Sequence, residues 1–324
     1  GPTKKPLSEK LIRRLRARFG PKGLLHYGQG KWYPGEPLPR WALGLYWRKD
    51  GQPIWANDEL LGSENEAYGY TWKDALALTE ELTRQIGVDR SYINPAYEDP
   101  VKFSLREREL PVNVDPLDSK LDDPQERQQL LKVFDRGLNT PIGYILPLQR
   151  AFEKDGPTWQ SGLWMLRGKQ LYLVPGDSPM GLRLPLESLP WAKKEDRPVI
   201  GTSDPSGYRP ALPSRRAMVV SQKQGDAPRD SGVFESNEQT SHELPQDRLP
   251  ESGESAPWVV RTAMCVECRD ERIYVFMPPA ENIEDYLDLI AAVEHAAEIT
   301  GTSVLIEGYA PPHDPRVEYR KVTP

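Results

Sequence analysis

The chain has 324 residues, a formal net charge of −6 and two cysteines. The acidic balance argues against a nucleic-acid or membrane-surface partner, because such binders usually carry a net basic field. One disulfide between the two cysteines could not define the fold of a chain this long. The sequence has no run of about 18 apolar residues, so it predicts no membrane span. We therefore expect a cytoplasmic protein without nucleic-acid or membrane partners. Its 33 prolines and 25 glycines predict long ordered loops.

The first predicted element is a helix from Ser8 to about Phe19 with Ser8 as its N-cap. Four apolar side chains lie on one predicted stripe of this helix: Leu7, Leu11, Leu15 and Phe19. The opposite face is basic, which indicates either a phosphate contact or, more commonly, a solvated surface.

Next along the chain, residues 42–47 read as a strand. The Asp50-Gly51 pair predicts a hairpin turn, with Pro53–Ala56 as the return strand.

A second helix is predicted from Thr71 to Ile86. Thr71 and Asp74 have the spacing of a capping box, and Gly87 supplies the left-handed end. A third helix is predicted from Asp123 to Arg136, with a proline at its first position.

Short β-like segments follow at residues 142–146, 162–167 and 171–174, which favours a sheet over a helical bundle. Residues 221–256 are rich in Ser, Gln, Glu, Asp and Pro. Because such a segment buries too little apolar surface to offset its ordering entropy, we expect a disordered insertion.

A ββαβ run is predicted after this insertion. Its strands are expected at residues 259–268 and 272–277, its helix at 283–299 and its last strand at 303–307. We therefore expect an α+β fold with a mainly antiparallel sheet, flanking helices and long ordered loops. Residues 1–220 and 257–324 would form parts of one domain around the insertion.

Five separated motifs carry a resemblance to a known family. They are Leu24–Glu36 (LLHYGQGKWYPGE), Pro39–Ala42 (PRWA), Leu110–Leu117 (LPVNVDPL), Pro175–Gly181 (PGDSPMG) and Val275–Pro279 (VFMPP). In this order they resemble bacterial proteins in which a transglutaminase-like domain precedes an amidoligase domain. Five motifs in order are far more specific than any one glycine pattern.

The resemblance implies a glutamine-synthetase-like carboxylate–amine ligase. Such enzymes use ATP and Mg²⁺ to convert a carboxylate into an acyl phosphate, which an amine then attacks. The implied partners are small-molecule or peptide carboxylates and amines, together with the remainder of the amidoligase polypeptide. Family motifs expected before and after these residues are missing, so the resemblance implies an incomplete domain with weak or no activity alone.

The first motif supplies candidate ligand-binding groups. Gly28 and Gly30 permit close backbone approach, Lys31 suits a phosphate, and His26 or Gln29 could orient a substrate beside Trp32. The competing interpretation is a tight structural loop packed by tryptophan. The motif is not a P-loop, because it lacks the Gly-Lys-Ser/Thr ending.

The fourth motif places three polar groups around a loop. Asp177 and Ser178 suit substrate or phosphate contact, and Arg183 suits a bidentate clamp on a carboxylate or phosphate. A structural turn is the alternative. Asp115 before Pro116 is a weaker substrate-binding candidate, since Asp before Pro has ordinary structural reasons.

The strand predicted at residues 259–268 carries Arg261 and Glu267, six residues apart and so on one face of a regular strand. Glu267 is the main Mg²⁺ candidate and Glu307 a second, while Arg261 joins Lys31 and Arg183 as a catalytic candidate. A surface salt bridge is the alternative for Glu267.

Cys265 and Cys268 match C-x-x-C in letters alone, because residues i and i+3 of a strand face opposite ways. We interpret them as incidental.

A different class of function stays open, in which aromatic loops make a non-catalytic peptide- or sugar-binding module. Trp32, Tyr33, Trp41 and Trp47 would then line an exposed groove. A polar pocket containing Lys31, Arg183 and Glu267 would favour the ligase.

Overall fold

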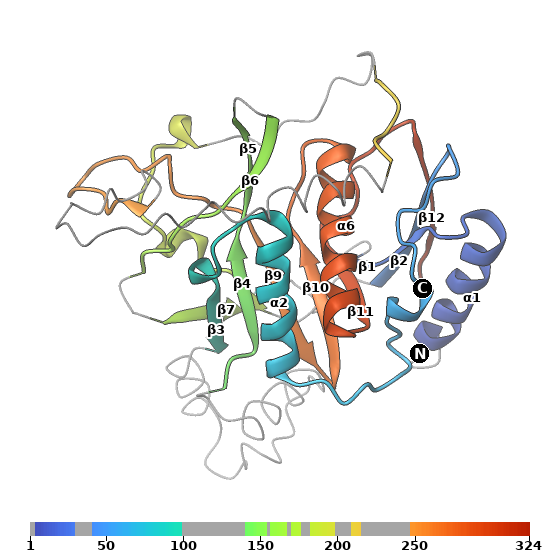
Figure 1. The fold of residues 1–324 in the computed structure, drawn as a ribbon. Coiled ribbons are helices and arrows are strands. Elements are labelled where there is room, and N and C mark those ends of the chain that lie inside the picture. The colour runs from blue at the N-terminus through green and yellow to red at the C-terminus, as the bar shows by residue number, and fades with distance from the viewer. Residues whose placement is uncertain are drawn as a thin grey trace, which may run out of the picture.

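The computed structural model describes residues 4–29, 41–98, 140–153, 156–166, 170–175, 182–197, 209–214 and 247–324. Within these residues a large mixed sheet carries helices on its faces (Figure 1), which confirms the predicted α+β class. The helices are α1 (Lys4–Phe19), α2 (Trp72–Ile86) and α6 (Ile283–Thr300). Short 3-10 helices are η1 (Asp58–Leu60), η2 (Arg90–Tyr92), η3 (Leu186–Ser188) and η4 (Lys194–Asp196). None of the helices in the described ranges combines the length and apolar character needed to cross a bilayer.

Among the described residues, the main sheet contains ten strands in the order β12-β2-β1-β11-β10-β9-β4-β3-β7-β8. Before residue 247 its strands are β1 (Leu24–Gln29), β2 (Trp41–Arg48), β3 (Asn94–Glu98), β4 (Gly143–Pro147), β7 (Leu171–Pro175) and β8 (Leu182–Arg183). After it they are β9 (Ala263–Arg269), β10 (Arg272–Met277), β11 (Val304–Gly308) and β12 (Val317–Val322). Strands β5 (Gln149–Glu153) and β6 (Gly156–Gln160) form a separate hairpin.

Most neighbouring strands in the main sheet are antiparallel. The parallel pairs are β1 with β11, β10 with β11, and β3 with β7. Strands β9, β10 and β11 lie between β1 and β4, so segments far apart in sequence share the sheet.

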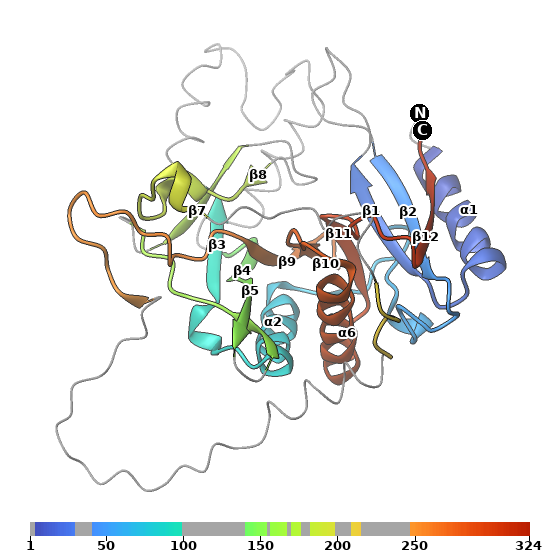
Figure 2. The same ribbon diagram turned by 90° about the horizontal axis from the view of Figure 1, so that it is seen from above.

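Helices α2 and α6 lie side by side over one face of the central strands, whereas α1 lies beside β2 and β12 (Figure 2). Beneath α2 and α6 the strands present Val266, Val275 and Ile306, all with 1% exposure or less. This apolar layer is the main core. A smaller apolar cluster around Ile145, Leu173 and Cys265 lies on the opposite face of the sheet, on strands β9, β4, β3 and β7.

The predicted ββαβ run is confirmed by β9, β10, α6 and β11. Asn282 caps α6 by accepting from the Asp285 N–H at 2.8 Å, and Gly301 ends the helix in the left-handed region. The capping box of Thr71 and Asp74 is also present in α2, which Gly87 closes as predicted. Strands β2, β4 and β7 match three further predicted segments.

The predicted orientation of the first helix is wrong. Helix α1 begins at Lys4, so Ser8 lies inside it and donates to the Lys4 carbonyl instead of capping the start. Leu7 is 63% exposed and Leu11 47% exposed. The buried residues are Glu9, Ile12 and Arg16. The helix is turned this way because Glu9 and Arg16 bond to other elements while Ile12 fills the core.

Two predicted strands are absent from the described segments. Residues 53–56 form no strand, because β12 rather than this segment pairs with β2. Residues 162–166 are also irregular, and there the Trp164 indole donates to the Val260 carbonyl at 2.7 Å. The helix predicted at 123–136 and most of the predicted insertion, 221–246, lie outside the described residues.

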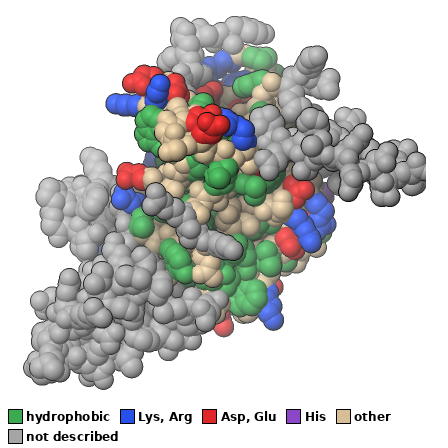
Figure 3. All heavy atoms as spheres, turned by 90° about the vertical axis from the view of Figure 1, so that its left-hand side faces the viewer, with side chains coloured by type: hydrophobic (Ala, Val, Ile, Leu, Met, Phe, Trp, Pro, Cys, Tyr) green, Lys and Arg blue, Asp and Glu red, His purple; other side chains and the backbone are tan. Residues whose placement is uncertain are grey.

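The side of the molecule that carries segments 182–197 and 247–262 has a mixed surface (Figure 3). Hydrophobic side chains lie between charged ones there. Trp191 and Leu249 are exposed members of these segments.

Candidate active site

Two buried glutamates share one face of the central sheet. On β10, Tyr274 and Phe276 are two residues apart and so point the same way. Tyr274 is in register with Glu267 on β9, and Phe276 with Glu307 on β11. The strand period therefore brings Glu267 and Glu307 to the face opposite α2 and α6. Their exposed fractions are 6% and 2%.

The Arg269 guanidinium lies between these carboxylates. Its terminal nitrogen contacts Glu307 Oε2 at 2.6 Å, and its Nε lies 3.6 Å from Glu267 Oε2. The guanidinium carbon also lies 3.7 Å from the centre of the Tyr274 ring, so Arg269 stacks on the neighbouring strand. Asp270 and Glu271 make the turn that brings these strands together, both with positive φ angles.

The polar atoms of this group are incompletely satisfied. Glu267 Oε2, Glu307 Oε1 and Arg269 Nε are buried without a hydrogen-bond partner among the described residues. Burial of an unpartnered polar group costs free energy. A ligand that bonded to these atoms would recover part of that cost.

Burial also changes the protonation of the group. It raises the pKa of Glu267 to about 8, against the opposing effect of Arg269. Burial raises the pKa of Glu307 as well, again opposed by Arg269. Although burial disfavours the charge on Arg269, the carboxylates of Glu307 and Glu267 raise its pKa. A carboxyl whose pKa is raised in this way keeps its proton to a higher pH than an exposed glutamate does.

Gly143 makes room for Glu267. This glycine on β4 is in register with Glu267. A Cβ at position 143 would lie 2.9 Å from Glu267 Cγ and 3.0 Å from the Val266 carbonyl oxygen. Only glycine therefore allows β4 to approach the strand while the Glu267 side chain lies over it.

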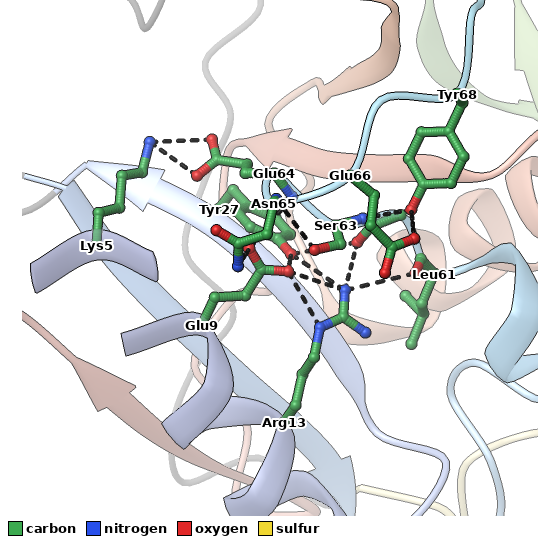
Figure 4. A network of polar contacts seen from close by, with 11 residues as sticks. Lys5, Glu9, Arg13, Tyr27, Leu61, Ser63, Glu64, Asn65, Glu66 and Tyr68 are labelled. Carbon is green, nitrogen blue, oxygen red and sulfur yellow. Dashed lines mark hydrogen bonds and ion pairs between the residues drawn. The ribbon is translucent and has the colours of Figure 1, made fainter. Parts of the chain in front are cut away.

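A polar network joins the same sheet face to α1 (Figure 4). Tyr27 on β1 is in register with Glu307 and donates to Glu9 Oε1 at 2.9 Å. Arg13 bonds to Glu9 and to the carbonyl oxygen of Gly62, the latter at 2.6 Å. The network thus fixes residues 61–66 beside the strands that carry the two glutamates.

The structure places the candidates of the first motif apart from this group. His26 is in register with Ile306, the neighbour of Glu307, so its ring lies on the opposite sheet face. Burial and the Lys321 ammonium lower the pKa of His26 to about 4, which keeps it neutral. Gly28 lies against this ring, since an added Cβ would be 3.0 Å from His26 Nδ1. Gln29 is exposed at the end of β1.

Neither described arginine candidate lies beside Glu267. Arg183 is exposed on β8, which is separated from β9 by β4, β3 and β7. The prediction that Arg261 lies on the strand with Glu267 is wrong, because β9 begins at Ala263. Arg261 instead donates to the Pro190 carbonyl.

The remaining candidates lie outside the described residues: Gly30, Lys31, Trp32, Asp115, Asp177 and Ser178. Of the aromatic candidates for the binding-module alternative, Trp41 and Trp47 are partly buried and pack on the main core. Trp32 and Tyr33 are outside the described ranges, so that alternative stays a prediction.

The prediction that Cys265 and Cys268 face opposite ways is confirmed. Both are free thiols, with Cys265 in the smaller apolar cluster and Cys268 against the main core, on opposite faces of β9.

Sequence reasoning missed Arg269, Tyr274 and the network around Glu9. The signal for Arg269 was its spacing of two residues from Glu267, which puts both side chains on one strand face. No local signal connects Arg269 with Glu307, because that contact depends on how the strands are ordered.

The chemistry of the two glutamates suits Mg²⁺. This ion prefers oxygen ligands and is commonly bound by one or two carboxylates together with substrate phosphates. Within the described residues, Glu267 Oε2 and Glu307 Oε1 have no hydrogen-bond partner, and no group of three or more His, Cys, Asp or Glu could bind a metal ion by itself. The residues therefore fit an ion that completes its shell with substrate oxygens.

Comparison with known proteins gives one match. No curated protein and no solved structure matches the chain. One family model, described as "Putative amidoligase enzyme (DUF2126)", matches residues 1–324. Because this match covers the whole sequence, the chain belongs to that amidoligase family.

Proposed function

We propose that this chain provides part of the active site of an ATP-dependent carboxylate–amine ligase. The observation that carries the proposal is the buried group of Glu267, Arg269 and Glu307. Among the described residues, Glu267 Oε2, Glu307 Oε1 and Arg269 Nε have no hydrogen-bond partner. Membership of the amidoligase family supports the reaction class. The glutamine-synthetase-like relationship remains part of the proposal.

In the proposed reaction, a substrate carboxylate oxygen attacks the γ-phosphate of ATP, and ADP leaves. The amine nitrogen then attacks the acyl carbon, the bond from carbon to phosphate oxygen breaks, and inorganic phosphate leaves as the amine loses a proton. Most of the work for the protein is to position these groups and to balance developing negative charge.

The residues present have separate roles in this proposal. Glu267 and Glu307 would hold Mg²⁺, which when bound would neutralise charge on the phosphates. Arg269 keeps the two carboxylates from repelling each other and directs an N–H group that can donate to a phosphate or carboxylate oxygen. The Tyr274 ring stacks against the guanidinium and helps to hold it in position.

Calorimetric titration with Mg²⁺ and ATP tests the proposal. We expect the double variant Glu267→Gln/Glu307→Gln to bind Mg²⁺ and ATP at least tenfold more weakly than the unchanged protein, because neither amide can become a negatively charged ligand for the ion. Glu318→Gln is the matched control, since Glu318 is a half-exposed glutamate on β12. Equal affinity in the double variant and the unchanged protein would refute the assignment.

A further inference from the structure

Residues 61–66 form a loop that is fixed at almost every position. The Gly62 N–H donates to the Val304 carbonyl at 2.8 Å, and the Ser63 N–H donates to the Tyr68 hydroxyl at 2.9 Å. The Asn65 N–H donates to Ser63 Oγ at 3.1 Å. A loop with this many bonds cannot easily change its course.

Glu9 supplies the central bonds of this loop. Its carboxylate is 2% exposed, and Oε2 accepts from the Glu64 N–H at 3.2 Å and from Asn65 Nδ2 at 3.0 Å (Figure 4). Oε1 accepts from Arg13 and Tyr27. Burial of a carboxylate is costly unless it is well paired. These hydrogen bonds to Glu9 hold the Glu64 backbone in place.

The Glu64 side chain takes no part in these bonds. Its carboxylate instead holds the Lys5 ammonium with both oxygens, at 3.0 Å to Oε1 and 2.8 Å to Oε2 (Figure 4). Lys5 is about half-exposed, whereas Glu64 is mostly covered. A solvated lysine can leave such a pair at little cost. Glu64 is therefore a positioned carboxylate that already receives a primary ammonium.

Glu64 also lies within electrostatic range of the candidate active site. Together with burial, its negative charge raises the pKa of Tyr274 and of Glu307. Glu307 is nine-tenths buried or more and has a partnerless oxygen, Oε1. Tyr27, in register with Glu307, donates to Glu9 Oε1, and Glu9 Oε2 accepts from the Glu64 N–H, so this network joins the Glu64 backbone to the strand beside Glu307.

We propose that Glu64 binds the ammonium group of a primary-amine substrate, in the place that the Lys5 ammonium occupies in this structure. The inference rests on the proposed function and names the class of its second substrate. Lys5 then acts as an internal competitor that the substrate displaces. Glu9, Arg13 and Tyr27 are positioning residues, because they touch the loop and not the amine.

The test is a titration with Nα-acetyl-L-lysine amide, followed by nuclear magnetic resonance without ATP or Mg²⁺. Nα-acetyl-L-norleucine amide serves as the control ligand without an ammonium. We expect Glu64→Gln to weaken binding at least tenfold and Lys5→Met to strengthen it severalfold. Glu64→Gln retains the backbone N–H that Glu9 holds, so the loop is preserved. Glu318→Gln, which removes a carboxylate paired with Lys49, should bind as the unchanged protein does.

Each outcome decides the inference. Opposite effects of the Lys5 and Glu64 substitutions support it. If the unchanged protein binds too weakly to measure, Glu64→Gln is placed in the Lys5→Met background, where it should abolish the gained binding. Equal binding of the lysine and norleucine ligands, unchanged binding in Glu64→Gln, or no gain in Lys5→Met overturns it. Because ATP and Mg²⁺ are absent, failure of the Mg²⁺ and ATP titration on the Glu267 and Glu307 variants is a separate result.

Discussion

The two faces of strands β9, β10 and β11 bury different chemistry. One face presents Val266, Val275 and Ile306 to α2 and α6. The other presents Glu267 and Glu307, which are also buried. Apolar and charged residues that alternate along a strand usually indicate that the charged face is solvated. Here the alternation persists although both faces are covered.

This difference shows where stability and function separate in the sheet. The apolar face stabilises the fold because its side chains bury apolar surface away from water. The charged face has a desolvation cost that Arg269 only partly offsets, since three of its polar atoms make no hydrogen bond within the described residues. Local rules of folding are most often broken at functional sites. For this reason we propose the face with Glu267 and Glu307 as the functional face of these strands.

The largest expected effect comes from removal of the guanidinium. Arg269→Met leaves the buried Glu307 carboxylate without its cation, and we expect a loss of about 3–5 kcal/mol in the free energy of unfolding at pH 7. Ile290→Ala provides the apolar comparison, because Ile290 is fully buried in α6 and its truncation should cost about 2–5 kcal/mol.

Urea denaturation at pH 7 and pH 5 separates these two losses. The Arg269→Met loss should shrink at pH 5, where the carboxyls can protonate, whereas the Ile290→Ala loss should not change. If the Arg269→Met loss is the same at both pH values, the carboxylates do not have the charge assigned to them.

A second, smaller effect concerns the pH dependence of stability. The pKa of Glu267 is raised from 4.5 to about 8 in the folded protein. The folded state therefore binds more protons than the unfolded state between these values, and stability falls as pH rises through this window. Its contribution is fully present below about pH 4.5 and lost above about pH 8.

The variant Glu267→Gln cannot titrate, so it should lose this part of the pH dependence. Measured at pH 5, 6, 7 and 8, the unchanged protein should lose stability relative to Glu267→Gln as pH rises. A difference that is constant, or that changes in the opposite direction, would show that burial does not raise the pKa of this carboxyl.

Gly143→Ala tests the space around Glu267. The added methyl group would overlap Glu267 Cγ and the Val266 carbonyl, and overpacking of this kind costs about 1–3 kcal/mol. Thermal or urea unfolding measures the loss. The double variant Gly143→Ala/Glu267→Ala removes Cγ and should recover part of it, which a double-mutant cycle detects as a non-additive term. If the losses in the free energy of unfolding are fully additive, Gly143 is not needed to make room for the Glu267 side chain.

Local patterns were sufficient to predict much of the fold. The Asp270-Glu271 turn, the Gly301 helix end and the Thr71 capping box depend on neighbours in sequence, and the elements that they delimit are confirmed. Strand β12 was missed because its pairing with β2 is a long-range contact. The return strand expected at residues 53–56 was wrong for the same reason, because β12 takes the place beside β2.

The candidate site was less predictable for the same physical reason. Glu267 and Glu307 could be chosen as carboxylates on predicted strands, but the arginine that joins them could not. Arg261 has the correct spacing for a regular strand, yet the strand begins after it. Arg269 becomes part of the site through the order of β9, β10 and β11.

The smallest expected effect lies in α1. This helix also has two different sides, but here polar residues are buried beside Ile12 and leucines are exposed. Leu11 is 47% exposed, whereas the adjacent Ile12 is 1% exposed. We expect Leu11→Ala to change stability by no more than about 0.5 kcal/mol and Ile12→Ala to cost about 2–5 kcal/mol. Urea denaturation of the two variants compares them directly. A large loss in Leu11→Ala with a small one in Ile12→Ala would restore the orientation expected from the leucine stripe. It would also remove Glu9 from the loop that positions Glu64, because Glu9 and Ile12 share the inward side of the helix.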